Sequence, residues 1–106
     1  MELINGRYHI DGVDVLKIVD EFESPVYVYS AETMKAQFEK LNNAFPGVKL
    51  GLHYARKALS NITILKYMKQ LGTGLDAVSI QEVQLGLKAG YAPDQILYTP
   101  NGVSME

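Results

Sequence analysis

Lys57 is the residue in this chain whose type and position most directly suggest chemistry. It lies in the stretch LHYARKALSN (residues 52–61), at the end of an expected strand and before an expected helix. In a barrel of alternating strands and helices, the reacting groups gather at this end of the strands. A partly desolvated lysine there has a lowered pKa, and its neutral amine can attack a carbonyl to form a Schiff base. The alternative is a solvated surface lysine beside Arg56.

Two acids and a histidine are further candidates. Asp76 lies inside an apolar strand candidate, LDAV (75–78), where an unpaired charge is costly, so a partner or a functional role is expected. Glu82 ends an S-x-x-E capping box, and a structural and a functional role are both open for it. His53 shares the strand face of Lys57 by the period of two, and a packed barrel histidine is the alternative to a functional one.

The first 30 residues predict short elements. Asp11-Gly12, between weakly alternating runs, indicates a tight hairpin. The apolar spacing from Val15 to Phe22 predicts a short helix that ends before Ser24-Pro25. The stretch VYVY (26–29) favours a strand because it consists of β-branched and aromatic residues.

A regular alternation of helix and strand patterns follows. Ser30 is expected to cap a helix, which Pro46-Gly47 stops. The first expected helix has Met34, Phe38, Leu41 and Phe45 on its apolar face. The second has Ile62, Leu65, Met68 and Leu71 and ends at Gly72. The third has Ile80, Val83 and Leu87, with Ser79 as its N-cap, and ends at Gly90. The strand candidates are residues 48–55, 75–78 and 96–99. Because each helix carries the chain back to the same edge, the strands are expected to be parallel.

A parallel sheet of so few strands is expected to be part of a larger α/β fold, because its outer strands would expose unpaired backbone. A small three-layer α/β domain is the alternative that the length permits. We expect residues 31–106 to form the first modules of a β/α barrel. Residues 1–30 are expected to form a segment that belongs to, or borders, a second β-rich domain.

The composition is that of an ordinary globular domain, with 106 residues, 47% of them hydrophobic and 21% charged. The absence of cysteine, with only two histidines, excludes a disulfide framework and a structural zinc site, and no metal site is expected. A net charge of -2 gives no basic surface for nucleic acid or an anionic membrane. No stretch approaches the length of a membrane span, so we expect a cytoplasmic protein with small-molecule or protein partners.

Several motifs together resemble a known family. They are SPVYVYS (24–30), HYARKALSN (53–61), GLDAVSIQEV (74–83), AGY (89–91) and ILYTPNG (96–102). In this order and spacing they resemble the N-terminal part of the diaminopimelate decarboxylase family. That family belongs to the alanine-racemase-like, fold-type III group of pyridoxal-phosphate enzymes. The resemblance implies the N-terminal part of a (β/α)8 TIM-type barrel, incomplete in this chain.

The resemblance also implies roles for the candidate residues. Lys57 would form the Schiff base with pyridoxal phosphate, and Asp76 and Glu82 would lie close to the cofactor and its lysine as catalytic acids that shuttle a proton. Asp76 and His53 are expected to be cofactor-binding residues beside Lys57. The implied reaction is decarboxylation of meso-2,6-diaminopimelate to L-lysine, in a homodimer. The alternatives are another decarboxylase of this group, acting on ornithine, arginine or carboxynorspermidine, and a non-catalytic relative that binds pyridoxal phosphate. A third alternative is a purely structural fragment or interaction module that does not bind the cofactor through Lys57.

Two positions depart from the family pattern, and several later motifs have no counterpart in this chain. Arg56 stands where the family commonly has an apolar or small residue, and Leu59 replaces a frequent asparagine. By alternation Arg56 points away from the Lys57 face toward the covering helices, so it must reach water or pair with an acid. The family's phosphate-binding glycine-rich loop, its acid facing the pyridine nitrogen and its cross-dimer cysteine are missing. The chain alone is therefore expected to be inactive.

Overall fold

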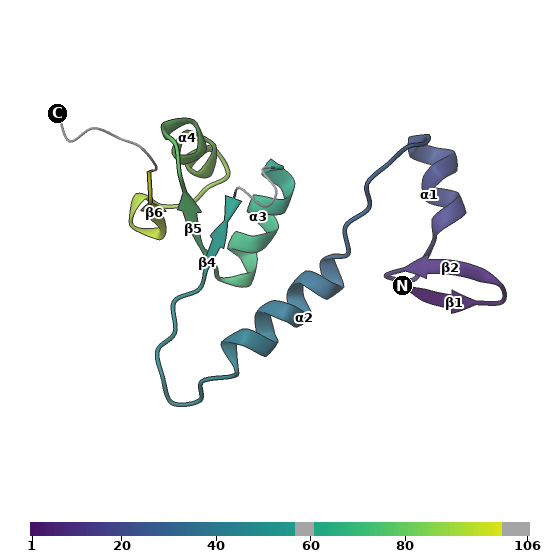
Figure 1. Ribbon diagram of the computed structural model, residues 1–106, viewed down its shortest axis with the longest axis horizontal. Coiled ribbons are helices and arrows are strands. Elements are labelled where there is room, and N and C mark those ends of the chain that lie inside the picture. Colours follow the sequence, from purple (N-terminus) through teal and green to yellow (C-terminus); the bar gives the residue numbers. More distant parts are fainter. Residues whose placement is uncertain (57–60, 101–106) are drawn as a thin grey trace. The chain divides into compact units, whose positions relative to one another are not determined.

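The computed structural model divides into two compact units, Met1–Ala44 and Phe45–Glu106 (Figure 1). It describes residues 1–56 and 61–100. Each unit contains its own three-stranded sheet, antiparallel in the first and parallel in the second. Among the described residues, no helix is both long and apolar enough to cross a membrane.

The antiparallel sheet of the first unit is held by two tight turns. Its strands are β1 (Glu2–Ile4), β2 (Arg7–Ile10) and β3 (Val13–Asp14), in that order. Asp11 and Gly12 join β2 to β3 with φ of 50° and 78°, which confirms the predicted hairpin. Asn5 and Gly6 join β1 to β2 with φ of 50° and 76°, a turn that the sequence interpretation missed. Two consecutive left-handed residues give a turn whose twist matches that of the flanking strands.

Helix α1 (Val15–Phe22) confirms the predicted short helix and begins at a buried carboxylate. Asp14 is its N-cap: Oδ1 accepts the N–H of Leu16 at 2.9 Å, and Oδ2 accepts a hydrogen bond from Arg7 Nη1 at 2.9 Å. The Leu16 N–H, and then Arg7, lower the pKa of Asp14. One side chain therefore joins the helix start to strand β2.

Helix α2 (Ala31–Asn42) begins at Ser30, as predicted, but ends earlier than expected. Ser30 Oγ accepts the N–H of Thr33 at 3.0 Å. At the other end the N–H of Ala44 donates to the carbonyl of Leu41 at 3.2 Å, which closes a tight turn instead of another helical turn. The prediction that Pro46-Gly47 stops the helix was therefore wrong, because the chain leaves the helix before it reaches them.

The predicted strand at residues 26–29 is not formed. These residues, VYVY, have no regular structure, and Tyr27 is 91% exposed. A high β-propensity reflects how well a side chain packs on a pleated surface between neighbouring strands. No described strand pairs with this segment, so its side chains have no neighbouring strand to pack against and a strand is not stabilised.

The second unit alternates strand and helix, as predicted. Its elements are β4 (His53–Ala55), α3 (Ile62–Leu71), β5 (Gly74–Ala77), α4 (Ile80–Lys88), the short 3₁₀ helix η2 (Pro93–Gln95) and β6 (Ile96–Tyr98). The strands are parallel in the order β4-β5-β6. The first is shorter than the predicted 48–55, because its pairing with β5 starts where the N–H of Gly74 donates to the carbonyl of Leu52 at 2.7 Å.

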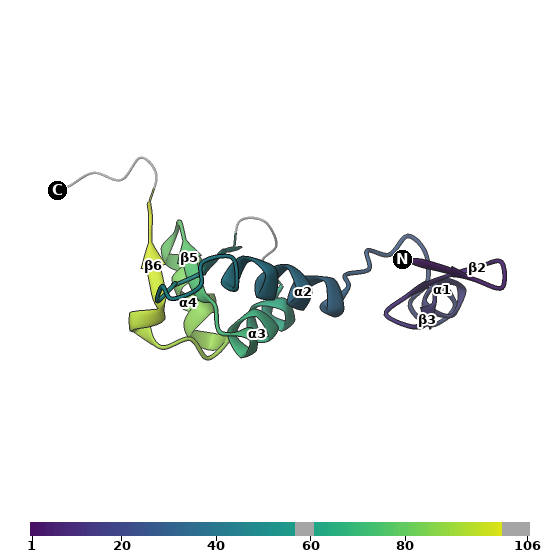
Figure 2. The ribbon, with the colours of Figure 1, turned by 90° about the horizontal axis from the view of Figure 1, so that it is seen from below.

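Helices α3 and α4 lie on the same side of the parallel strands (Figure 2). The core between them is formed by Leu65, Leu75, Ala89 and Tyr91. The Tyr91 hydroxyl donates to the carbonyl of Leu65 at 3.1 Å, so this buried polar atom is satisfied. Burial raises the pKa of Tyr91.

The face of α4 that packs on the sheet is not the predicted apolar stripe. Glu82 and Gly86 are buried, whereas Ile80 and Leu87 are 55% and 45% exposed. A Cβ on Gly86 would clash with Leu75, so glycine lets the helix approach the sheet closely. Gly72, with φ of 106°, ends α3 in the left-handed conformation that the sequence predicts.

Candidate active site

One face of the parallel sheet is not covered by α3 and α4. Leu75 and Ala77 of β5 are completely buried toward the helices, so Gly74 and Asp76 point to the opposite side. Register places further residues on that side: His53 lies opposite Gly74, Ala55 opposite Asp76, and Asp76 opposite Leu97. We call this set, His53, Ala55, Gly74, Asp76 and Leu97, the open face.

Asp76 has a hydrogen-bond partner on the neighbouring strand. Thr99 Oγ1 donates to Asp76 Oδ1 at 2.5 Å, the short distance typical of a hydroxyl bonded to a carboxylate. The N–H of Thr99 donates to the carbonyl of Ala77 at 2.9 Å, which continues the pairing of β6 with β5. The partner that the sequence interpretation expected for Asp76 is therefore Thr99.

The sequence interpretation missed Thr99 as a site residue, although a signal was present. Thr99 follows Leu97 by two residues in ILYT, so both lie on the same face of β6. Strand β6 is adjacent to the strand that carries Asp76. A hydroxyl on the same face, at the carboxyl end of β6, can therefore contact the Asp76 carboxylate.

His53 lies at the other end of the open face, where β4 begins. Its ring covers Gly74: a Cβ there would lie 2.6 Å from His53 Cδ2 and 2.8 Å from Nε2. At about 3.3 Å per residue, this level is roughly 7 Å along the strands from the level of Asp76. The structure therefore places His53 on the predicted face but gives no contact between it and Asp76.

Glu82 lies on the helix side of the sheet and contacts Arg56. Glu82 Oε1 is 3.0 Å from Arg56 Nη1, so the prediction that Arg56 reaches water or pairs with an acid is confirmed. The capping box is formed in part: Ser79 Oγ accepts the N–H of Glu82, but the Glu82 carboxylate accepts the N–H of Val78 rather than that of Ser79.

Lys57 lies outside the described residues, so its predicted role remains a prediction. Strand β4 ends at Ala55, two residues before Lys57 in the chain. Among the described residues, no three acidic or histidine side chains are grouped as a metal site would require.

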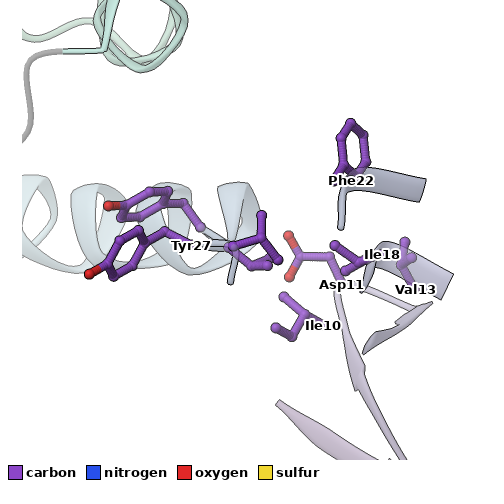
Figure 3. A pocket seen from close by; sticks show the side chains of 9 residues that line it. Ile10, Asp11, Val13, Ile18, Phe22 and Tyr27 are labelled. Carbon is purple, nitrogen blue, oxygen red and sulfur yellow. The ribbon is translucent and has the colours of Figure 1, made fainter. Parts of the chain in front are cut away.

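A cavity of about 420 Å³ lies within the first unit, among residues of β2, β3, α1 and the segment that follows α1 (Figure 3). Figure 3 shows Ile10, Ile18 and Phe22 among its apolar lining, with Asp11 as the one carboxylate. That carboxylate already accepts hydrogen bonds from Ser30 Oγ, at 2.6 Å, and from the N–H of Glu32, at 3.2 Å. The described lining includes no histidine, so this cavity does not combine a carboxylate with a histidine as the open face does.

Comparisons with known proteins agree with this fold. Residues 31–106 match the family described as pyridoxal-dependent decarboxylase, pyridoxal binding domain. The diaminopimelate decarboxylase of Methanothermobacter thermautotrophicus is 36% identical over 104 residues, which cover 94% of this chain and 24% of that protein. That of Aquifex aeolicus is 37% identical over 102 residues, 96% of this chain and 24% of that protein.

Solved structures agree as well. A crystal structure of diaminopimelate decarboxylase from Methanocaldococcus jannaschii with L-lysine superposes with a TM-score of 0.88 at 30% identity, covering 94% of this chain and 24% of that one. A crystal structure from Aquifex aeolicus superposes with a TM-score of 0.86 at 38% identity, covering 97% of this chain and 25% of that one.

The chain spans about a quarter of the length of the curated relatives that it matches. The matched structures include diaminopimelate decarboxylases, which are TIM-barrel enzymes, so β4, β5 and β6 with their helices are an incomplete part of such a barrel. Since the family match covers residues 31–106, well over half of this sequence, the chain belongs to the pyridoxal-dependent decarboxylases, in the part that forms their pyridoxal-binding domain.

Proposed function

We propose that this chain is the lysine-bearing part of a pyridoxal-phosphate-dependent diaminopimelate decarboxylase. The reaction would release carbon dioxide from meso-2,6-diaminopimelate and leave L-lysine. The observation that carries the proposal is the hydrogen-bonded pair of Asp76 and Thr99, at the carboxyl ends of two parallel strands in a sheet whose strand β4 leads into Lys57. The relatives named diaminopimelate decarboxylase support the substrate.

The side chains of the open face, together with Lys57 just after β4 in the sequence, fit part of what pyridoxal phosphate requires. Its aldehyde needs an amine, which Lys57 supplies, and a nearby group that can exchange a proton, which Asp76 supplies. Its phosphate needs cationic side chains or N–H donors, and the open face as defined carries no lysine or arginine. We therefore propose that the phosphate is held by other parts of the complete protein.

Each residue has a distinct task in the proposed reaction. Lys57 would hold the cofactor through its side-chain amine, the one group in this proposal that can bind an aldehyde covalently. Thr99 holds Oδ1 of Asp76, so that Oδ2 is the oxygen left to take up and return a proton. His53, which packs over Gly74, fills the opposite end of the open face and limits the access of water there. Pyridoxal phosphate, when bound, would supply the electron sink that decarboxylation needs.

A chimera tests this proposal. Residues 1–106 would replace the matching quarter of the Aquifex aeolicus relative, so that the remaining parts are present. We expect the chimera to release carbon dioxide from meso-2,6-diaminopimelate faster than from L-ornithine or L-arginine, and K57A to abolish release. A folded, cofactor-loaded chimera that prefers ornithine or arginine would point to another decarboxylase of the family, and one inactive on all three would point to a non-catalytic role.

We also propose the remaining properties that the resemblance implies: a homodimer, a cytoplasmic location and a second β-rich domain bordered by residues 1–30. The start of the family match at residue 31 supports that division. Sedimentation of the chimera checks the dimer, and limited proteolysis checks the boundary. A monomer that turns over the substrate at the full rate would contradict the first of these proposals.

A further inference from the structure

The ion pair between Arg56 and Glu82 joins two neighbouring modules of the second unit. Arg56 directly follows β4 and directly precedes Lys57, whereas Glu82 lies in the first turn of α4. Arg56 Nη1 is 3.0 Å from Glu82 Oε1, and the two side chains are only 16% and 11% exposed. Removing one partner of a pair so shielded from water leaves an uncompensated charge, which is strongly destabilising.

Glu82 is engaged at both carboxylate oxygens and at its backbone. Oε1 contacts Arg56, and Oε2 accepts the N–H of Val78 at 2.5 Å. The N–H of Glu82 donates to Ser79 Oγ at 3.2 Å. A carboxylate held at both oxygens is fixed in position, whereas Asp76 has a described hydrogen-bond partner at one oxygen only. Glu82 is therefore better placed to fix a cation than to shuttle a proton.

We infer that Arg56 and Glu82 form a clamp that holds the end of β4, directly before Lys57 in the sequence, against the turn between β5 and α4. This inference rests on the proposed role of Lys57. Glu82 and Arg56 are then positioning residues, which act through Lys57 and do not touch the substrate. The clamp is available to this chain because position 56 carries a cationic side chain long enough to reach the neighbouring module.

Hydrogen exchange on the 106-residue chain, without cofactor, tests the clamp directly. We expect R56M and E82Q each to speed amide exchange of Ala55 and Arg56 by about tenfold or more, because the same contact is lost in both. The double variant R56M/E82Q should exchange no faster there than the single variants, and R56K should stay near the unmodified chain. K35M is the matched control, since it removes an exposed ion pair on α2 that is 4.0 Å long.

The core amides of Leu65 and Leu75 serve as the reference for global unfolding. If the single variants unfold, the double variant still tests whether the contact restrains the end of β4, because it leaves no unpaired charge. Unchanged exchange at Ala55 and Arg56 in a folded R56M or double variant would overturn the clamp. The clamp would also be overturned if E82Q sped amide exchange only at Val78 and at the start of α4. Glu82 would then act as a helix cap alone.

A second measurement separates the clamp from the proposed function. Pyridoxal phosphate and borohydride are added to the same variants, and the label on Lys57 is compared with the label on Lys66 and Lys69 of α3. We expect R56M to lower the Lys57 share at least threefold and R56K to restore it. If the unmodified chain shows no preference for Lys57 while the exchange results hold, the role of Lys57 fails and the clamp remains only a structural contact.

Discussion

Each of the two units of this chain is stabilised internally by a different kind of interaction. Among the described residues of Met1–Ala44, Asp14 is the only buried one, and large apolar side chains such as Leu3 and Phe22 are more than 60% exposed. The second unit buries Leu65, Leu75 and Ala77 completely. The first therefore depends on turns, caps and hydrogen bonds, and the second on apolar burial.

The difference matters for function, because the candidate active-site residues belong to the unit with the apolar core. Leu75 and Ala77 alternate with Asp76 along β5, so packing on one face of the strand fixes the direction of the carboxylate on the other. A site placed on strands whose opposite face is packed keeps its geometry better than one placed on loops. Substitutions in each unit can test whether the first depends on hydrogen bonds and the second on apolar burial.

The largest expected effect is that of Leu75→Ala in the core of the second unit. A fully buried leucine truncated to alanine costs about 2–5 kcal/mol of unfolding free energy. Urea denaturation followed by NMR would measure this loss at Leu65, while the hairpin amides of Tyr8 and His9 should keep their midpoint. Equal loss in both units would contradict the view that they are stabilised separately.

Thr99→Val should reduce activity more than stability. A hydrogen bond to a charged group is worth about 1.5–3 kcal/mol, so losing the hold on Asp76 should lower kcat of the chimera by roughly 10- to 100-fold. Thr99→Ser keeps the hydroxyl and should stay within about threefold of the unmodified rate. The matched control is Thr73→Val, since the Thr73 hydroxyl donates to the Met68 carbonyl at 3.1 Å and belongs to the core.

Thr73→Val should lower stability and leave kcat almost unchanged. If Thr99→Val lowered only the melting temperature, Thr99 would be part of the framework and not of the site. The same comparison of variants therefore distinguishes the open face from the core behind it.

Tyr91→Phe removes from the core a hydroxyl that bonds to the Leu65 carbonyl and to Thr73 Oγ1, without removing apolar area. The Tyr91 hydroxyl donates to the Leu65 carbonyl, and we expect a loss of about 1 kcal/mol in the unfolding of the second unit. Chemical denaturation followed by circular dichroism can measure it. A loss as large as that of Leu75→Ala would show that hydrogen bonds and not apolar burial dominate this core.

The smallest expected effect concerns acid sensitivity in the first unit. Asp11 accepts hydrogen bonds from Ser30 and from the N–H of Glu32, and the Ser30 bond is the main cause that lowers the pKa of Asp11 below its usual 3.8. Because the pKa is lower in the folded state, this contribution is present above pH 3.8 and is lost as the pH falls through the lowered value.

Asp11→Asn tests that assignment. We expect it to remove most of the change in the Glu32 amide signal between about pH 5 and pH 2, while the Leu75 amide signal does not change in either protein. An unchanged acid response of Glu32 in the variant would mean that another carboxylate controls the start of α2.

The sequence predicted the features that depend on local chemistry. Asp11-Gly12 gave the hairpin, Ser30 and Ser79 gave the helix starts, and Gly72 gave a helix end. Each of these follows from one or two residues and the backbone beside them. The parallel order of β4, β5 and β6 followed from the alternation of patterns.

The features that depend on contacts distant in sequence were harder to predict. The stretch 26–29 has the composition of a strand but no partner strand, and the stripe with Ile80 and Leu87 is not the face of α4 that meets the sheet. The Thr99 contact to Asp76 joins residues 23 positions apart and needs the register of two strands. Arg56 could be assigned an acidic partner in principle, but the choice of Glu82 required the packing of α4 on β5.

The most direct test of the proposed function is the reaction of Lys57 with pyridoxal phosphate. The 106-residue chain and the chimera would be mixed with the cofactor, reduced with borohydride and digested, and the modified lysine would be located by mass spectrometry. We predict that Lys57 carries the label in preference to Lys49, Lys66 and Lys69. Label distributed evenly over these lysines, in the chimera as well as in the chain, would contradict the assignment of Lys57.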